Sequence, residues 1–207
     1  MQKRALKTKE RILRSSIRLF ARYGYNGISV DRIAKESNAN KQRIYEYFKN
    51  KKTLFENCLV KSFENIAVEE LDLIGELEND SGNMTEVILR HYMRLHEKHP
   101  DFWKLISWAN LEPEPFSKCL KNIKAENYGK LNAFYVRGQE TGIFRKDISF
   151  GIYMFILLAV TYFYHSNQKT LSNTLNSLNS GLFTQTGAAQ IVNSCAMLLS
   201  TKGVASI

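Results

Sequence analysis

The sequence predicts an all-α fold, with a small N-terminal domain of three helices followed by a larger helical domain. Apolar residues recur every three or four positions in most segments, which is the period of a helix with one buried face. The 207-residue chain contains only three prolines, and alternating runs of β-branched residues are few. Its composition, 44% apolar and 24% charged, is that of an ordinary globular protein that can bury a substantial core.

Residues 7–23 predict the first helix, because one face of this segment is apolar or small at helical spacing. That face consists of Ile12, Leu13, Ser16, Ile17, Phe20 and Tyr23. Gly24 is expected to end the helix, since glycine readily adopts the left-handed conformation of a C-cap. Ser29 predicts the N-cap of a second helix, and Asn38 predicts a tight turn after it, because asparagine tolerates a positive φ.

Asn40 predicts the cap of a third, short helix that ends near Tyr47, and this helix has two distinct faces. The apolar face consists of Ile44, Tyr47 and Phe48. The opposite face consists of Lys41, Gln42 and Tyr45, with Arg43 and Glu46 at the flanks. A short helix of this kind can rest on two other helices while its polar side meets a partner.

The positive charge is concentrated in the first sixty residues. This segment has 15 Lys and Arg against 5 Asp and Glu, whereas the remainder is close to neutral with 14 against 15. A basic head on a neutral body is the electrostatic pattern expected of a nucleic-acid-binding module. Charge alone leaves a solvated basic surface or a membrane-surface patch open as alternatives.

Residues 8–59 together resemble the DNA-binding domain of the TetR family of transcriptional regulators. The matching pieces are Thr8 to Leu13, Leu19-Phe20, Tyr23-Gly24-Tyr25, Ser29-Val30, Ile33-Ala34, Asn40-Lys41, Ile44 to Phe48 and Asn50 to Phe55. They cover about fifty residues without a gap, which is much more specific than a lone helix-turn-helix pattern. The sequence departs from the family where Asn38 replaces the usual glycine, Asn40 the common Ser or Thr, and Gln42 a small residue. A relative's operator sequence therefore does not carry over.

The third helix is expected to enter the major groove, where each base pair presents a distinct pattern of donors and acceptors. Gln42 can bond adenine N6 and N7, and Arg43 can bond guanine O6 and N7, so these two are the expected base readers. Phosphate contacts position such a reader without specifying sequence. The expected phosphate contacts are Ser29, Asn40, Lys41, Tyr45 and Lys51.

The rest of the chain, residues 52–207, is called the body here. It is expected to be helical and to resemble the family's regulatory domain in architecture only. Its expected helices cover residues 52–77, 85–98, 102–110, 116–139, 150–165 and 186–201, and residues 167–185 are expected to be a loop with a short helical turn. The predicted domains are residues 1–51, the helix-turn-helix DNA-binding domain, and residues 52–207, the effector-binding and dimerisation domain. The resemblance implies a homodimer formed through the last two long helices, here 150–165 and 186–201. Both are apolar on nearly all sides, which suits burial on two faces, although core packing within a monomer is the alternative.

The body is also expected to bind a small aromatic or amphipathic effector, because aromatic side chains and a few polar groups occur together in it. The candidate ligand residues are Tyr92, His96, Trp103, Trp108, Tyr135, Tyr162 and His165. For each aromatic residue, packing in the core is the competing interpretation. The implied mechanism is that the effector tilts the connecting helix 52–77 and changes the distance between the two reading heads of the dimer.

The sequence predicts no enzyme, cofactor or metal site, because it contains no nucleophile and base pairing, phosphate loop or ligand-spaced histidines. Cys58, Cys119 and Cys195 are isolated, which fits a cytoplasmic protein with buried thiols. The apolar stretch 150–164 is shorter than the roughly 20 residues of a membrane span, and no signal peptide is visible.

The expected function is a ligand-responsive regulator, with repression as the expected direction. A helical small-molecule carrier with a basic head for membrane or RNA is the alternative.

Overall fold

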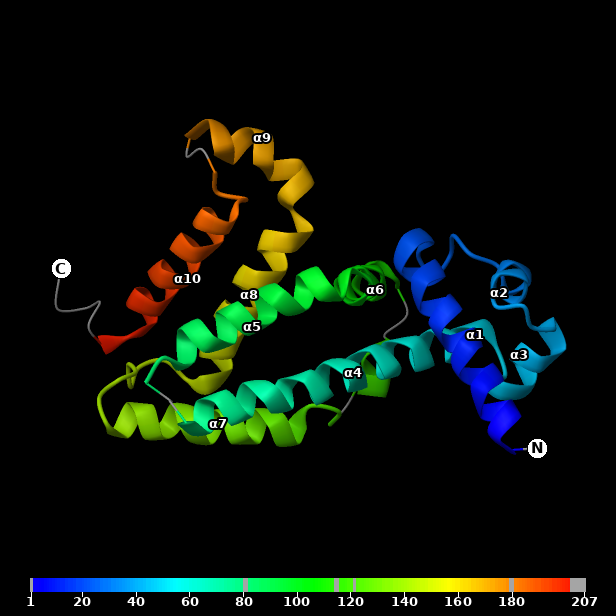
Figure 1. Cartoon of the computed structure of the whole chain (residues 1–207), viewed down its shortest axis with the longest axis horizontal. Helices are drawn as coiled ribbons and strands as arrows, with labels where there is room; N and C mark the ends of the chain where they lie inside the picture. The colour runs from blue at the N-terminus through cyan, green and yellow to red at the C-terminus, as the bar shows by residue number, and fades with distance from the viewer. Residues whose placement is uncertain (1, 80–81, 114–115, 121, 179–180, 202–207) are drawn as a thin grey trace. The chain divides into compact units, whose positions relative to one another are not determined.

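The computed structural model describes residues 2–79, 82–113, 116–120, 122–178 and 181–201, and these fold into α-helices joined by short connections (Figure 1). The elements in chain order are α1 (Gln2–Tyr23), α2 (Val30–Glu36), α3 (Lys41–Phe48), α4 (Lys51–Asn79), α5 (Met84–Lys98), α6 (Pro100–Leu111), the 3-10 helix η1 (Phe116–Leu120), α7 (Ala125–Glu140), α8 (Phe150–Ser166), α9 (Gln168–Leu178) and α10 (Gln185–Leu199). The expected all-α fold is confirmed. The described residues contain no β-strand beyond an isolated bridge between Phe144 and Ser200.

The chain forms two compact units, and the long helix α4 contributes residues to both. The first unit comprises residues 1–67 and 99–124, and the second comprises residues 68–98 and 125–207. Helix α4 begins at Lys51, beside the boundary that the sequence predicts between its two domains. The division into functional domains at residues 51 and 52 stays a prediction.

The first unit is held together by one apolar core under α1, α2 and α3. Its fully buried side chains include Ile12, Phe20, Ile33, Ile44, Phe48, Leu54 and Phe55. The rings of Phe20 and Phe55 meet edge to face with centroids 5.0 Å apart, and Phe55 meets Phe116 of η1 at 4.7 Å. Helix α6 packs on α1, so a segment far along the chain completes the core of the N-terminal helices.

Gly24 and Trp108 explain how α6 approaches α1 so closely. Gly24 ends α1 with φ of +74°, as the sequence predicts. The Trp108 ring lies against its bare Cα, where an added Cβ would come within 2.8 Å of Trp108 Cε3. The indole N–H of Trp108 donates to the Ala21 carbonyl at 3.3 Å. Trp108 is therefore a structural residue of the first unit.

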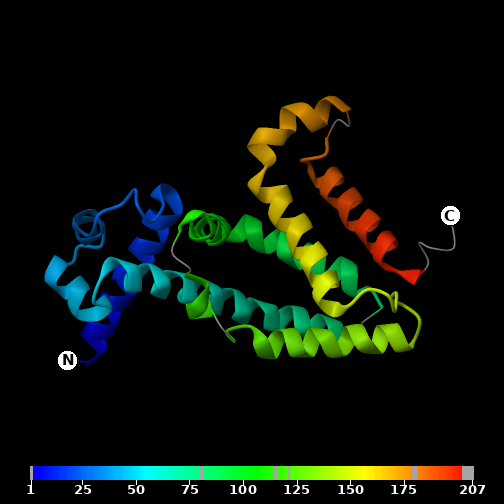
Figure 2. The same ribbon diagram turned by 180° about the vertical axis from the view of Figure 1, so that it is seen from behind.

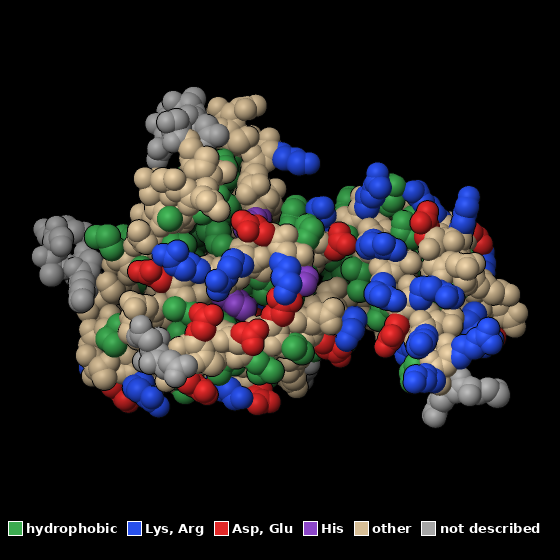
Figure 3. All heavy atoms as spheres, viewed as in Figure 1, with side chains coloured by type: hydrophobic (Ala, Val, Ile, Leu, Met, Phe, Trp, Pro, Cys, Tyr) green, Lys and Arg blue, Asp and Glu red, His purple; other side chains and the backbone are tan. Residues whose placement is uncertain are grey.

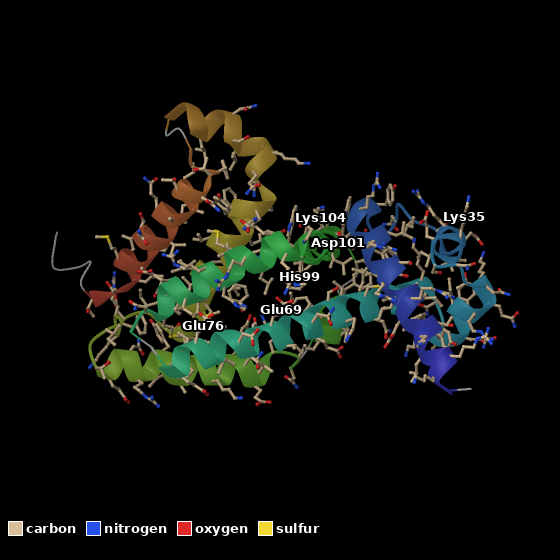
Figure 4. All side chains as sticks on the ribbon, in the orientation of Figure 1. Lys35, Glu69, Glu76, His99, Asp101 and Lys104 are labelled. Atoms are coloured by element: carbon tan, nitrogen blue, oxygen red, sulfur yellow. The ribbon has the colours of Figure 1, made fainter. Side chains whose placement is uncertain are left out.

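The second unit is built around α5, on which α8 and α10 both pack (Figure 2). Its core includes a group of stacked aromatic rings, with Tyr135 and Tyr153 centroids 4.4 Å apart and Tyr135 and Phe144 centroids 5.0 Å apart. The hydroxyls of Thr85 and Tyr153 are hydrogen-bonded at 2.9 Å across α5 and α8. Two exposed ion pairs join α4 to α5, Glu69 with Lys98 at 3.0 Å and Glu76 with Arg94 at 3.9 Å; Figure 4 labels both glutamates.

Two sequence predictions about the body are wrong. The expected helix 116–139 is interrupted: η1 ends at Leu120, Asn122 takes φ of +69°, and α7 begins only at Ala125. A left-handed residue cannot continue an α-helix, so the segment restarts after it. The expected loop 167–185 contains the 11-residue helix α9 instead. Its half-buried Leu171 and Leu175, four positions apart, supply the apolar stripe that the Ser- and Asn-rich composition obscures.

Helix α8 is the most apolar helix of the described residues and spans 17 positions. None of the helices in this part of the chain combines the length and apolarity that crossing a membrane requires.

Candidate functional site

Helices α2 and α3 each begin at the N-cap that the sequence predicts. Ser29 Oγ accepts a hydrogen bond at 3.2 Å from the backbone N–H three residues later. Asn40 Oδ1 accepts one from the N–H of Gln42 at 2.8 Å. Asn38 lies between them with φ of +46°, and its carbonyl accepts a hydrogen bond from the Arg11 guanidinium of α1 at 3.1 Å. The two caps thus fix where α2 and α3 begin, and Arg11 of α1 contacts the turn between them.

Helix α3 has one buried and one exposed face, which confirms the two-faced pattern read from the sequence. Ile44 and Phe48 are each only 1% exposed, and Tyr47 is half-buried beside them. The exposed residues are Lys41, Gln42, Arg43, Tyr45 and Glu46. Figure 3 shows Lys and Arg side chains gathered over the part of the chain that contains α1, α2 and α3. The exposed face of α3 is therefore polar and lies on a basic surface.

Two carboxylates that the sequence analysis did not single out accompany the cations of α3. Lys41 Nζ lies 2.8 Å from Asp31 of α2, and Arg43 lies 3.0 Å from Glu46 one turn later. The hydrogen bond with Asp31 raises the pKa of Lys41. The spacing of three residues indicates the second pair, whereas only the packing of α2 against α3 reveals the first. All four side chains are exposed, so these pairs orient the cations more than they stabilise the fold.

Lys51, another expected phosphate contact, is positioned by an aromatic ring. Its ammonium lies 4.6 Å from the centroid of the Tyr25 ring, where a cation is attracted to the π face. Partial burial lowers the pKa of Lys51, and the charge of Glu112 acts in the opposite direction. The ammonium is thus held at the start of α4, immediately after α3.

The seven ligand candidates do not form one group. Trp103 and Trp108 belong to the first unit, where Trp103 lies beside Lys104 and Trp108 packs on Gly24. The other five belong to the second unit, but Tyr135 lies in its stacked aromatic core. The Tyr135 hydroxyl donates to the Ile148 carbonyl at 3.0 Å. Trp108 and Tyr135 thus both have packing contacts within their units, and their role as ligand contacts stays a prediction.

Three of the candidates, from α5 and α8, lie together in the second unit. The ring centroids of His96 and His165 are 5.4 Å apart, and those of His96 and Tyr162 are 6.3 Å apart. Burial lowers the pKa of His165, while the charge of Glu97 and a hydrogen bond to the Met93 backbone act in the opposite direction. The second ring nitrogen of His165, Nε2, is buried and has no hydrogen-bond partner within the described part of the chain.

The last candidate, Tyr92, belongs to a buried polar cluster that the sequence analysis missed. Glu70 of α4 is 0% exposed, and its carboxylate accepts a hydrogen bond from the Tyr92 hydroxyl of α5. Asn127 of α7 donates to the same carboxylate at 3.1 Å. Burial, together with the charge of Glu70, raises the pKa of Tyr92 well above its usual range. A glutamate within the helical stripe of α4 resembles any surface glutamate in sequence, so only the packing of three helices reveals this cluster.

Helices α8 and α10 also carry apolar side chains on their outer faces. The exposed apolar residues are Ile152, Phe155 and Phe163 of α8 and Met197 and Leu198 of α10. The opposite face of α8 is buried through Tyr153, Leu157 and Tyr164. These are the two helices for which the sequence predicts burial on two sides. Exposed large apolar side chains gathered on two helices are typical of an interaction surface.

The cysteines do not cluster with other potential metal ligands in the residues described. These residues contain no group of three or more His, Cys, Asp or Glu side chains that could hold a metal ion. Cys58 is buried, Cys119 and Cys195 are half-buried, and all three are free thiols. Burial raises the pKa of each thiol, which disfavours the reactive thiolate.

Comparison with known families agrees with this geometry. Residues 12–58, which contain the capped turn and α3, match the family of bacterial regulatory proteins called tetR. Residues 83–189 match the tetracyclin repressor-like C-terminal domain. The chain belongs to the TetR family. Its TetR-type helix-turn-helix consists of α2, the turn at Asn38 and α3.

Relatives and solved structures cover most of this TetR-family chain. The transcriptional repressor SCO4008 of Streptomyces coelicolor is 33% identical over 74% of this chain and 76% of its own. The transcriptional repressor NicS of Pseudomonas putida is 27% identical over 82% of this chain and 81% of its own. A TetR family regulator from Marinobacter aquaeolei superimposes with a TM-score of 0.70 at 16% identity, covering 97% of this chain and 99% of that one. FadR of Bacillus subtilis, solved with stearoyl-CoA, gives a TM-score of 0.69 at 14% identity, covering 93% of this chain and 98% of that one.

Proposed function

We propose that this TetR-family regulator is a cytoplasmic transcriptional repressor that binds a roughly palindromic operator as a homodimer and releases it when a small molecule binds. The observation that carries the proposal is the two-faced α3, whose back is buried through Ile44 and Phe48 while its polar side faces outward. The repressor activity of the relatives SCO4008 and NicS supports repression as the direction of control.

Gln42 and Arg43 read bases in the proposed complex. Both lie in the exposed first turn of α3, the part of a recognition helix that reaches base edges. Glu46 holds the Arg43 guanidinium at 3.0 Å and so limits its orientations before DNA arrives. Tyr45 and Lys41 lie on the same exposed side and contact phosphates, as do the capped N-termini of α2 and α3 at Ser29 and Asn40.

Replacing Gln42 or Arg43 with alanine is expected to relax base preference at one position of each half-site. Each bidentate contact with a base contributes about 1–3 kcal/mol of discrimination, so the preference falls by roughly 5- to 150-fold. The measurement is selection of bound sequences from a random duplex pool, followed by titration of the selected operator and of single-base variants.

The matched control is Lys49→Ala, an exposed cation just beyond α3. It is expected to lower the affinity for all duplexes alike and to leave the ranking of bases unchanged. If both reader variants keep the wild-type ranking as well, α3 does not read the operator and the proposed function is wrong.

Dimerisation through α8 and α10 is part of the proposal. Their exposed apolar faces would be covered by the same faces of a second copy, which gives the closed symmetry typical of homodimers. Two heads then bind half-sites about 34–36 Å apart, one turn of the duplex, and double the contacts with DNA. A single short helix contacts too few bases for useful specificity against a genome.

Effector binding is assigned to the second unit, around His96, Tyr162 and His165. If the Nδ1–H of His165 bonds the Met93 carbonyl, its buried Nε2 is an acceptor that a ligand hydroxyl or amide N–H would satisfy. FadR, whose fold is similar, was solved in complex with stearoyl-CoA, which supports a small-molecule effector for this chain. Because α4 contributes residues to both units, a shift of α4 is the proposed route from ligand to reading head.

The effector assignment is tested with small aromatic and acyl compounds screened by thermal shift, since a ligand that binds only the folded state raises its stability. For a compound that releases the operator, His165→Phe is expected to raise the half-maximal concentration by about tenfold, the effect of one lost hydrogen bond to a buried acceptor. Operator affinity without the compound serves as the internal control and stays at the wild-type value. An unchanged half-maximal concentration would place the ligand elsewhere.

A further inference from the structure

A small pocket between α1 and α2 is lined by three arginines that the reading mechanism does not use. Arg18 and Arg22 lie one turn apart on α1, and Arg32 lies on α2. The pocket has a volume of about 250 Å³. Ser15 and Leu19 of α1, which are both buried, also line the pocket. Since one water occupies about 30 Å³ of the liquid, the pocket has room for a phosphate group with several waters.

The ring of Tyr23 holds two of these guanidiniums in place. The Arg32 guanidinium carbon lies 4.2 Å from the ring centroid, and that of Arg22 lies 5.2 Å from the same centroid. A guanidinium stacked on an aromatic face keeps its N–H groups free to donate at its edge. Tyr23 therefore orients the guanidinium groups of Arg22 on α1 and Arg32 on α2 around one pocket.

The residues that line the pocket carry three positive charges and one negative charge, that of Glu36. Within the described residues, none of the guanidiniums of Arg18, Arg22 and Arg32 lies within 4.0 Å of a carboxylate. Glu36 also lines the pocket but forms no such pair with them. Three like charges gathered in this way repel one another, so an anion with several oxygens would lower the energy of the arrangement.

We infer that this pocket binds a phosphate group. The planar donor forks of arginine match phosphate oxygens in pairs, which a hydrated lysine does not. The phosphate comes either from the DNA backbone beside a half-site or from a small phosphorylated molecule. The first source rests on the proposed function, because it requires the head to lie on a duplex; the second does not.

The first arm of the test uses DNA and the full-length protein. Arg18→Gln, Arg22→Gln and Arg32→Gln are compared with Arg14→Gln on α1 and Lys35→Gln on α2, which remove the same charge outside the pocket; Figure 4 labels Lys35. If a backbone phosphate occupies the pocket, each pocket variant lowers the affinity for the operator and for a scrambled duplex by about tenfold. The slope of log K against the log of the salt concentration then falls in magnitude by about one. The control variants weaken binding by about twofold. Glu36→Gln, which removes the one carboxylate at the pocket, strengthens binding to both duplexes.

The second arm uses pyrophosphate without DNA, read from the side-chain Nε–Hε signals of arginine in NMR. If a free phosphate occupies the pocket, pyrophosphate causes saturable shifts that are lost in Arg32→Gln and retained in Lys35→Gln. Arg32→Lys keeps the charge but not the stacked fork, and it is expected to recover only part of the binding in whichever arm responds.

Each pattern of results has one meaning. Effects in the DNA arm alone assign the pocket to a backbone phosphate, effects of pyrophosphate alone assign it to a small phosphorylated ligand, and effects in both support the inference from either source. Pocket variants that match the controls in the DNA arm, together with no saturable shift by pyrophosphate, overturn it. A wild-type protein that binds no selected duplex would contradict the proposed function instead, and the pyrophosphate arm would still test the pocket.

Discussion

Phe155→Glu is expected to convert the protein into a monomer whose operator affinity is at least a hundredfold lower. Phe155 is 72% exposed on α8, so a glutamate there does not disturb the core of one chain. In the proposed dimer the same position is covered by a second copy, and a carboxylate buried without a partner is strongly unfavourable. A single reading head then binds without the gain in effective concentration that a linked second head provides, which is worth about a hundredfold or more.

Sedimentation at micromolar protein concentration measures the mass, and operator titration measures the affinity. Leu111→Glu is the matched control, because Leu111 of α6 is 73% exposed and equally apolar but lies outside α8 and α10. It is expected to remain a dimer. A Phe155→Glu protein that also remains a dimer with wild-type operator affinity would show that the outer face of α8 is not the interface.

Glu70→Ala is expected to destabilise the second unit by about 3 kcal/mol, because it removes the shared acceptor of two buried hydrogen bonds. The Tyr92 hydroxyl and the Asn127 amide both donate to this carboxylate, and Glu70 is 0% exposed. Each buried hydrogen bond to this carboxylate that is lost costs about 1–3 kcal/mol. The side chain removed also leaves a cavity among α4, α5 and α7.

Urea unfolding at one fixed protein concentration measures the loss, because the stability of a dimer depends on concentration. Glu69→Ala is the control on the adjacent residue, whose carboxylate forms the more exposed pair with Lys98. Its loss is expected to be below about 1 kcal/mol, as for other pairs near the surface. Equal losses in the two variants would mean that the cluster at Glu70 contributes no more than a surface pair.

The caps and the exposed face of the helix-turn-helix could be predicted from the sequence, because they depend on residues close together along the chain. A cap depends on one side chain and an N–H two or three residues away, so Ser29 and Asn40 could be assigned without knowing any other part of the chain. The two faces of α3 follow from helical spacing alone. The ion pair between Lys41 and Asp31 could not be predicted from sequence, because it depends on the angle at which α3 crosses α2.

The structure of residues 52–207 was harder to predict from sequence. Its composition suggested a loop where a helix forms, and several of its contacts depend on packing between distant segments. The polar stretch that forms α9 has the composition of a loop, yet Leu171 and Leu175 were enough for a helix. Trp108 looked like part of a ligand site because it is aromatic and near other aromatics in sequence. The structure packs it on Gly24, about 84 positions away along the chain, which no local pattern indicates.

The sequence by itself determined the all-α class, the capped helix-turn-helix and the side of α3 that is exposed, because these depend on neighbours within a few residues. Only the tertiary structure decided which groups meet across helices: the carboxylate of Glu70 with Tyr92 and Asn127, and the three arginines around Tyr23. The physical reason is that periodicity specifies which face of a helix is buried, whereas the residues opposite that face depend on how several helices pack together.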